Sequence, residues 1–128
     1  MKFEVALASD FPDKNLDLVT FFDCLHDMGD PVGAAKHVRQ ALKPDGSWMI
    51  VEPAAGDQLE NNLNPVSRMY YAASTMICVP TSLDQPVGAA FGAQAGLAKL
   101  SAAITQGGFA RVRKATETPF NMILEARP

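Results

Sequence analysis

Two short apolar runs with a well-marked helix between them constrain the fold of this 128-residue chain more than any other feature. The runs, Leu18 to Phe22 and Trp48 to Val51, are rich in β-branched and aromatic residues and are bounded by polar or turn residues. Such runs are typical of strands that are buried on both faces of a sheet. A strand, a helix and a second strand predict a βαβ unit, and therefore a parallel strand pair with a right-handed connection.

The helix between the two runs has clear start and stop signals. Asp30 is suited to cap its N-terminus, and Pro31 fits the first helical position, where no backbone donor is needed. Apolar residues then recur at helical spacing: Val32, Ala35, Val38, Ala41 and Leu42. Pro44 and Gly46 predict that the helix has ended and that a turn leads into the second strand.

The remaining segments predict further strands and helices. We expect strands over residues 3–8, 109–117 and 120–126, and helices over residues 65–80 and 97–104. The last two strands form a closing antiparallel hairpin, and Pro80 is expected to stop the first of these helices. One face of that helix is apolar, which predicts a core face or, as the alternative, a wall of a substrate pocket: Val66, Met69, Tyr70, Ala73, Met76 and Ile77. The segments 54–64 and 81–96 read as loops or lids.

Composition and charge exclude several classes of function. A hydrophobic content of 48% is enough for one core, so a single domain over residues 1–128 is expected. No apolar run approaches the ~20 residues of a membrane span, and no signal peptide is recognisable. Two cysteines, Cys24 and Cys78, make no disulfide framework, which favours a reducing, cytoplasmic setting. Residues 1–64 carry five Lys/Arg and eleven Asp/Glu, and this acidic balance argues against nucleic-acid binding.

The polar turn after the first apolar run carries the candidate chemistry. In parallel α/β sheets, ligands bind at the carboxyl ends of the strands, which is where this turn lies. His26 is the one side chain there that is suited to proton transfer near neutral pH, and Asp27 would orient it or take a proton itself. The alternative is that His26 only caps the turn or shapes the pocket. Cys24 and His26 supply only two ligands from one turn, so no metal site is expected.

The order of these motifs resembles the C-terminal portion of a class I S-adenosylmethionine (SAM)-dependent methyltransferase. In that family an Asp-Leu-Val strand, here at residues 17–19, ends at the cofactor and is followed by a turn bearing His or Asp. A Leu-Lys-Pro-Asp-Gly turn, here at residues 42–46, then leads into the next strand. The run from Phe22 to Met28 is most similar to a bacterial subgroup whose full-length members carry an N-terminal winged-helix region. The expected fold is therefore a partial Rossmann-like α/β sheet with flanking helices and a C-terminal antiparallel hairpin.

The resemblance also implies a cofactor, a reaction and a set of binding residues. SAM would donate a methyl group to a small-molecule acceptor, with His26 and Asp27 as the catalytic pair. Phe22, Asp23 and Cys24 would line the methionine end of SAM, and Ser9, Asp10 and Phe11 would lie beside its adenine. The family commonly has an Asp before the alanine of this last segment, whereas this chain has Leu7.

The family's glycine-rich loop and ribose-binding acidic residue both precede its third strand, and this chain has neither. The isolated chain is therefore expected to lack methyltransferase activity unless a partner chain completes it. The strand over residues 18–22 would also be left as an apolar sheet edge that invites pairing with another chain. Two alternatives follow: a non-catalytic, truncated α/β module that dimerises through that edge, or a small-molecule binding protein with its pocket under residues 54–96.

Overall fold

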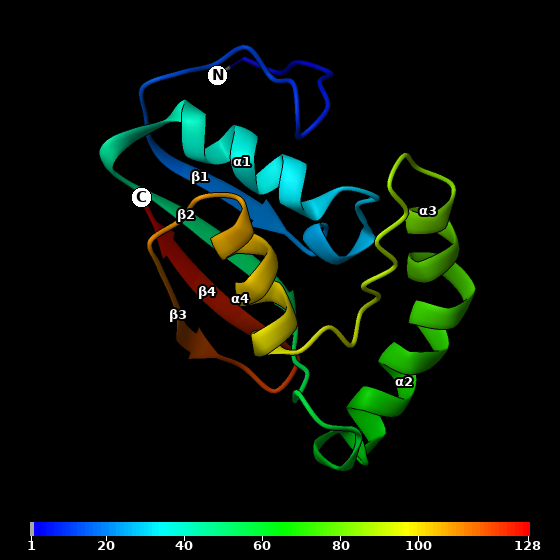
Figure 1. Ribbon diagram of the computed structural model, residues 1–128. Coiled ribbons are helices and arrows are strands. Elements are labelled where there is room, and N and C mark those ends of the chain that lie inside the picture. Colours follow the sequence, from blue (N-terminus) through cyan, green and yellow to red (C-terminus); the bar gives the residue numbers. More distant parts are fainter. Residues whose placement is uncertain (1) are drawn as a thin grey trace.

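The computed structural model describes residues 2–128, which form one four-stranded sheet with helices and an extended helical arm over residues 65–83 (Figure 1). The strands are β1 (Leu16–Phe22), β2 (Leu42–Pro53), β3 (Arg111–Glu117) and β4 (Asn121–Arg127). The α-helices are α1 (Pro31–Ala41), α2 (Pro65–Ala73), α3 (Val79–Leu83) and α4 (Leu97–Gln106). Short 3-10 turns lie at Leu25–Asp27 (η1) and Leu59–Asn62 (η2), and a π-helical turn lies at Ser74–Cys78 (η3).

The sheet has the order β1-β2-β4-β3, with one parallel and two antiparallel pairs. β1 and β2 are paired in parallel, and α1 connects them along the chain. β3 and β4 form the closing hairpin. The expected βαβ unit and the α/β class are thus confirmed. Asp30 caps α1 as expected, because its Oδ1 accepts a hydrogen bond from the Gly33 N–H at 2.7 Å, and Pro31 stands at the first turn.

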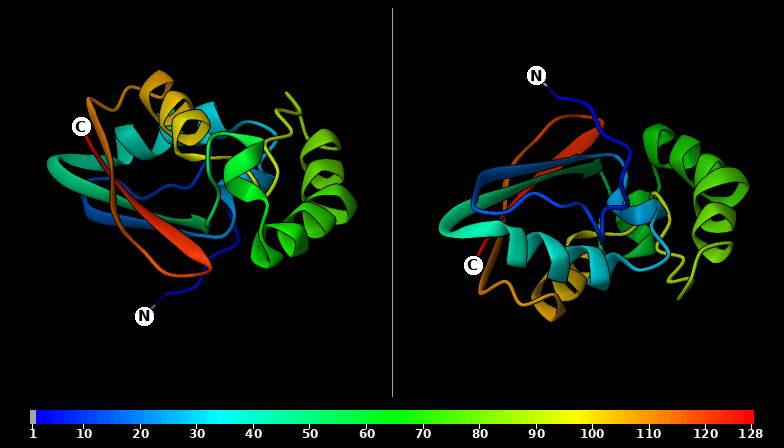
Figure 2. Two further views of the ribbon diagram at one scale, coloured as in Figure 1. Left: turned by 90° about the horizontal axis from the view of Figure 1, so that it is seen from below. Right: turned by 90° about the horizontal axis from the view of Figure 1, so that it is seen from above.

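Both long packing helices, α1 and α4, lie on the same face of the sheet (Figure 2). Burial therefore alternates along β2: Trp48 and Ile50 are fully buried, while Met49 and Val51, which alternate with them, are only half-buried. Leu18 on β1 is 55% exposed. No helix of residues 2–128 covers the face of the sheet opposite α1 and α4. The expectation that these strands are buried on both faces is wrong, because the helices supply apolar contacts on one side only.

The second strand is longer than expected and has an irregular start. β2 begins at Leu42, immediately after α1, and its pairing with β1 jumps from Leu16–Leu42 to Leu18–Ser47. The four residues 43–46, where a turn was expected, therefore bulge out of the β1–β2 ladder. Gly46 fits there because a Cβ would lie 2.9 Å from the Leu16 carbonyl oxygen.

Residues 3–8 do not form the expected strand. Phe3 and Val5 are almost fully exposed, and no strand of residues 2–128 lies beside this segment to take its backbone hydrogen bonds. A run of apolar, β-favouring residues needs such a neighbour before its backbone becomes a strand. The chain contacts α1 just after this segment, at Phe11, whose carbonyl oxygen lies 2.8 Å from His37 Nε2.

The helical arm does not stop at Pro80. A π-helical turn over Ser74–Cys78 precedes the proline, and the Val79 N–H bonds to the Ser74 carbonyl five residues back. The wider π turn changes the backbone pairing just where Pro80 lacks a donor, so α3 continues to Leu83.

The buried face of this arm is polar rather than apolar. Met69, Met76 and Ile77, which were expected in the core, are more than half exposed. The buried residues are small and mostly hydroxylated: Ser67, Ser74, Cys78 and Ser82. The hydroxyls of Ser74 and Ser82 satisfy backbone groups of neighbouring loops; the Ala93 N–H, for example, donates to Ser74 Oγ at 3.1 Å. The expected core face is wrong because the arm packs on loop backbone, which needs hydrogen-bond partners.

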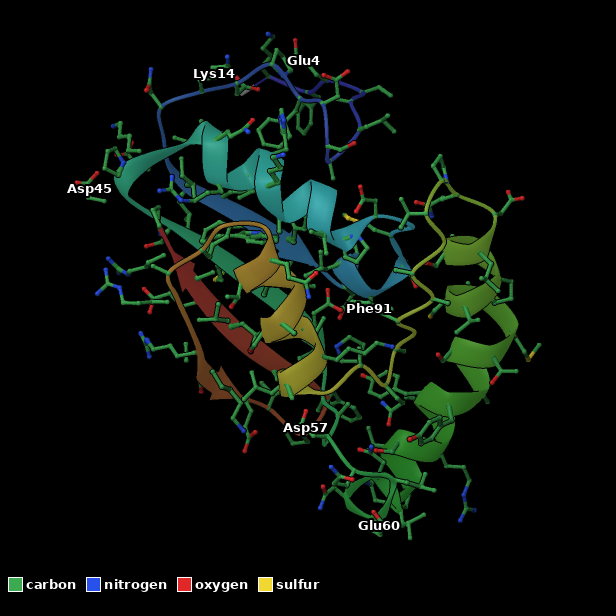
Figure 3. The ribbon with its side chains drawn as sticks, in the orientation of Figure 1. Glu4, Lys14, Asp45, Asp57, Glu60 and Phe91 are labelled. Carbon is green, nitrogen blue, oxygen red and sulfur yellow. The ribbon has the colours of Figure 1, made fainter. Side chains whose placement is uncertain are left out.

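Asp57, in the loop after β2, lies at the N-terminal end of α4 (Figure 3). The Ala98 N–H donates to Asp57 Oδ1 at 2.7 Å, so this carboxylate satisfies a free donor in the first turn of α4. The loop over residues 54–58 is thereby fixed to the helix that covers the sheet.

Replacing Asp30 by Ala should lower the free energy of unfolding by about 1 kcal/mol, because the cap of α1 is lost while its apolar face remains. Urea unfolding followed by circular dichroism measures the change. Asp45→Ala is the matched control, since Asp45 is an exposed aspartate in the bulge and should leave stability almost unchanged. Equal losses in the two variants would contradict the assigned cap.

Candidate active site

The carboxyl ends of β1 and β2 meet at one rim of the sheet. Phe22 pairs with Val51, and the Asp23 N–H donates to the Val51 carbonyl at 2.8 Å. Asp23 then adopts a left-handed backbone conformation with φ of 47°, which turns the chain sharply into η1. Its side-chain Oδ1 accepts a hydrogen bond at 3.1 Å from Asn121 Nδ2 at the start of β4. A turn held in this way presents His26 directly above the strand ends.

A buried pair of side chains joins the two strand ends. His26 Nδ1 lies 2.5 Å from Glu52 Oε2, and both side chains are almost completely buried. The other carboxylate oxygen of Glu52 accepts the Leu25 N–H at 2.9 Å, so the carboxylate is held from two directions. Because a carboxylate only accepts, this contact places the proton of a neutral imidazole on Nδ1 and leaves Nε2 as the acceptor.

The charges around His26 favour its protonated form. Burial alone lowers its pKa, but the hydrogen bond that His26 donates to Glu52 and the negative charges of Glu52, Asp27 and Asp23 together raise it above 6.5. Burial, and to a smaller extent the same three carboxylates, raises the pKa of Cys24 to about 11. Cys24 is therefore a neutral thiol at physiological pH, and the rim is a region of concentrated negative potential.

The helical arm places a second cysteine beside this pair. His26 Nε2 lies 3.1 Å from Asp27 Oδ1, and ligand atoms of His26, Asp27 and Cys78 all lie within 4.8 Å of one another. Burial, followed by the nearby Asp27 carboxylate, raises the pKa of Cys78 to about 11. An imidazole nitrogen, a carboxylate oxygen and a sulfur form a donor set that suits a soft divalent metal.

Hydrogen bonds to loop backbone hold the arm against the rim. Ser82 Oγ donates to the Met28 carbonyl at 2.8 Å, and Gln85 Nε2 donates to the Asp27 carbonyl at 3.0 Å. On the loop that carries Phe91 (Figure 3), the Gly92 N–H donates to the His26 carbonyl at 3.2 Å. These contacts explain how Cys78 reaches His26 across 52 positions of sequence.

The three residues expected beside adenine lie in three different surroundings. Ser9 lines a cavity of about 560 Å³ with Met28 and Asp30, and this cavity includes none of Phe22, Asp23 or Cys24. The Phe11 ring packs edge-on against His37 with the ring centres 4.4 Å apart. Asp10 is exposed. Their role at a cofactor therefore stays a prediction, as does that of Phe22, which is 61% exposed at the rim.

The sequence analysis identified neither the pairing of Glu52 with His26 nor the position of Cys78 beside this rim. A glutamate directly after an apolar strand was the available signal for Glu52, because a buried charge requires a partner. No local pattern identifies Cys78, since its contact with Asp27 depends on how the arm docks.

Comparison with known proteins gives a consistent picture. A family model described as "Methyltransferase domain" matches residues 3–85, which is more than half of the chain. No protein of the curated set matches the chain. Solved structures that resemble it include TnmH, human N-acetylserotonin methyltransferase in complex with SAM, and PigF with SAH.

These likenesses are close in fold and distant in sequence. TnmH has a TM-score of 0.74 at 16% identity and is matched by 99% of this chain. The human enzyme has a TM-score of 0.69 at 18% identity with 98% of the chain covered, and PigF has 0.67 at 13% with 94% covered. The chain spans 35% of TnmH and 33% of each of the other two. Among residues 2–128, no helix has the length and apolar character needed to cross a membrane.

The raised pKa of His26 predicts how stability changes with pH. The folded state binds the imidazole proton more tightly than the unfolded state, so this stabilisation is complete below about pH 6.5 and is lost as pH rises through the folded-state pKa. Glu52→Gln removes the hydrogen-bonded charge that raises this pKa. The stability advantage of the wild type over this variant should therefore shrink with rising pH.

Urea unfolding at a series of pH values, in buffer with a chelator, measures that difference. Glu60→Gln is the matched control, because Glu60 is an exposed glutamate on η2 and its replacement should give a pH-independent difference. An advantage over Glu52→Gln that grows with pH would contradict the assigned pair.

Proposed function

Because the chain belongs to the methyltransferase domain family, we propose that it forms the acceptor-side portion of a SAM-dependent methyltransferase, with His26 as the general base. The observation that carries this proposal is the buried His26–Glu52 contact of 2.5 Å at the shared end of two parallel strands. The acceptor would be a small molecule. The chain spans about a third of the related structures, so activity would require the chain or polypeptide that supplies the remaining cofactor contacts.

The residues at the rim divide the work of proton removal. SAM would supply an electrophilic methyl group to a nucleophilic O, N or C atom of the acceptor. His26 Nε2 takes the acceptor's proton, since Nδ1 is already committed to Glu52. Glu52 is a positioning residue that fixes the imidazole and stabilises the imidazolium that forms. Asp27, 3.1 Å from Nε2, lies on the acceptor side, where its carboxylate can align a hydroxyl toward the base.

The charge of the rim supports a role in holding SAM. Carboxylates of Asp23, Asp27 and Glu52 all act on Cys24 and His26, and such a negative field favours the sulfonium cation of SAM. The exposed Phe22 ring and the left-handed Asp23 backbone would line its methionine end. Ser9, Asp10 and Phe11 are proposed for the adenine end on the family resemblance alone.

Binding of S-adenosylhomocysteine (SAH) tests the cofactor role directly. Titration of the 15N-labelled chain, completed by the polypeptide that supplies the remaining cofactor contacts, should shift the backbone amide signals of Phe22, Asp23 and Cys24, while signals of the β3–β4 hairpin near Arg113 stay fixed as an internal control. Shifts of the amide signals of Ser9, Asp10 and Phe11 would support their proposed place beside the adenine of the cofactor. Saturating SAH that moves none of the rim signals would refute the proposal.

His26→Gln should lower the rate of methyl transfer by about 100-fold or more while leaving SAH affinity nearly unchanged, because it removes the base and keeps an amide of similar size. The assay requires the completed enzyme. His37→Gln is the matched control, since His37 lies on α1 and contacts the Phe11 carbonyl, away from the rim. An unchanged rate in His26→Gln would remove His26 as the base.

The unlike edges of the sheet support a second proposal, that two copies of the chain pair through β1. The β3 edge carries Arg111, Arg113, Lys114 and Glu117, which discourage strand pairing. β1 has a single charged residue, Asp17, and no strand of residues 2–128 pairs with its outer edge. An antiparallel pair centred on Thr20 sets Leu18 of one copy opposite Phe22 of the other, which buries both exposed side chains.

Leu18→Lys should convert this dimer to a monomer in sedimentation equilibrium, because a charge at the pairing edge opposes sheet extension. Met76→Lys is the control: Met76 is 78% exposed, against 55% for Leu18, but lies on the arm. A wild-type chain that stays monomeric at high concentration would exclude the paired edge.

We also propose a cytoplasmic location and no nucleic-acid or membrane partner. The free thiols of Cys24 and Cys78 support a reducing compartment. The acidic rim would repel phosphate backbones and anionic lipid surfaces alike.

A further inference from the structure

We propose that the rim holds a binding site for one zinc ion, formed by His26 Nε2, the Asp27 carboxylate and Cys78 Sγ. The three ligand atoms converge within 4.8 Å of one another, from the turn after β1 and from the helical arm. Cys24, the nearest cysteine in sequence, is not part of this cluster. The proposal concerns the same histidine as the proposed base, but metal binding itself does not depend on methyl transfer.

The surroundings of His26 are those of a metal ligand. Zinc-bound histidines usually donate their second ring N–H to a carboxylate, which fixes the ring and strengthens the ligating nitrogen. His26 makes this contact with Glu52 at 2.5 Å, and Glu52 is itself held by the Leu25 N–H. The lone pair of Nε2 then points toward Asp27.

The Asp27 carboxylate also offers a free oxygen to a metal ion. Its Oδ1 is buried and has no hydrogen-bond partner among residues 2–128, although it lies 3.1 Å from His26 Nε2. The contact between Nε2 and Oδ1 is favourable only when a proton or a cation lies between the two atoms, so a metal ion competes there with the second imidazole proton. A divalent ion resolves this contact and the negative potential of the rim together.

The third ligand is the Cys78 thiol. It is buried at the π turn of the arm, and zinc binding would displace its proton to give a thiolate ligand. Three protein ligands of type N, O and S leave one tetrahedral position for water or another small ligand. The mixed set with a thiolate favours zinc over magnesium or calcium, which prefer oxygen ligands alone.

A bound zinc ion would change what His26 can do. The metal and a substrate proton compete for the same Nε2 lone pair, so His26 cannot act as a base while the metal is bound. Zinc would thus act as an inhibitor of the proposed methyl transfer, and a chelator would relieve the inhibition.

The test uses Zn²⁺ in calorimetry and Co²⁺ as a spectroscopic probe, on the full chain without any methyl donor. We expect one ion per chain, with intense visible bands of tetrahedral Co²⁺ and a near-ultraviolet thiolate-to-cobalt absorption. Cys78→Ser and Cys78→Ala should each lose the thiolate absorption and weaken Zn²⁺ affinity by more than about 100-fold. Glu52→Gln should weaken it by about 10- to 100-fold, because it removes the partner of Nδ1.

Cys24→Ser is the matched control and should keep both the thiolate absorption and the zinc affinity. Circular dichroism shows that each variant is folded, and the two replacements of Cys78 guard against one failing to fold. Zinc binding that survives both, or no binding in the wild type, would overturn the proposal. Because no readout involves SAM, an inactive enzyme that binds zinc refutes only the proposed methyltransferase function.

Discussion

The contact between His26 and Glu52 is the interaction on which the rim depends. A carboxylate that is completely buried is costly unless it is paired and hydrogen-bonded, and Glu52 meets both conditions through the imidazole and the Leu25 N–H. The contact exists only because β1 and β2 run parallel in the register that sets Phe22 beside Val51. A slip of one residue would turn Glu52 toward the open face of the sheet and leave His26 without its partner.

The one-sided packing of the sheet explains most of the remaining architecture. α1 and α4 bury alternate residues of the central strands around Trp48, whose ring packs against Phe21 and Phe109. The other face keeps apolar side chains without a helical cover in residues 2–128. The arm is separate from this core, and it is held by hydroxyl and amide hydrogen bonds to loop backbone rather than by apolar burial.

The elements that the sequence predicts well are those with local signals. The cap at Asp30, the proline at position 31 and the two apolar runs were sufficient for the βαβ unit, and that unit alone brings the histidine turn to the end of β2. The strand expected over residues 3–8 failed because strand formation requires a neighbour that no local pattern reports. The expected core face of the arm failed because Ser74 and Ser82 are buried by hydrogen bonds to backbone, which apolar periodicity does not detect. The proximity of Cys78 to the rim follows from the same docking and was equally inaccessible.

The two edge strands of the sheet differ in charge, and this difference bears on how copies of the chain could associate. β3 is guarded by charge and by an irregularity between Lys114 and Thr116, whereas β1 is open. A sheet with two open edges can add molecules at both ends and grow into a fibre. If two copies pair through β1, as proposed, both outer edges of the joined sheet are the charged β3 strands, and further copies would find no open edge. The charges on β3 would thus allow two copies to pair while opposing the open-ended strand addition that leads to aggregation.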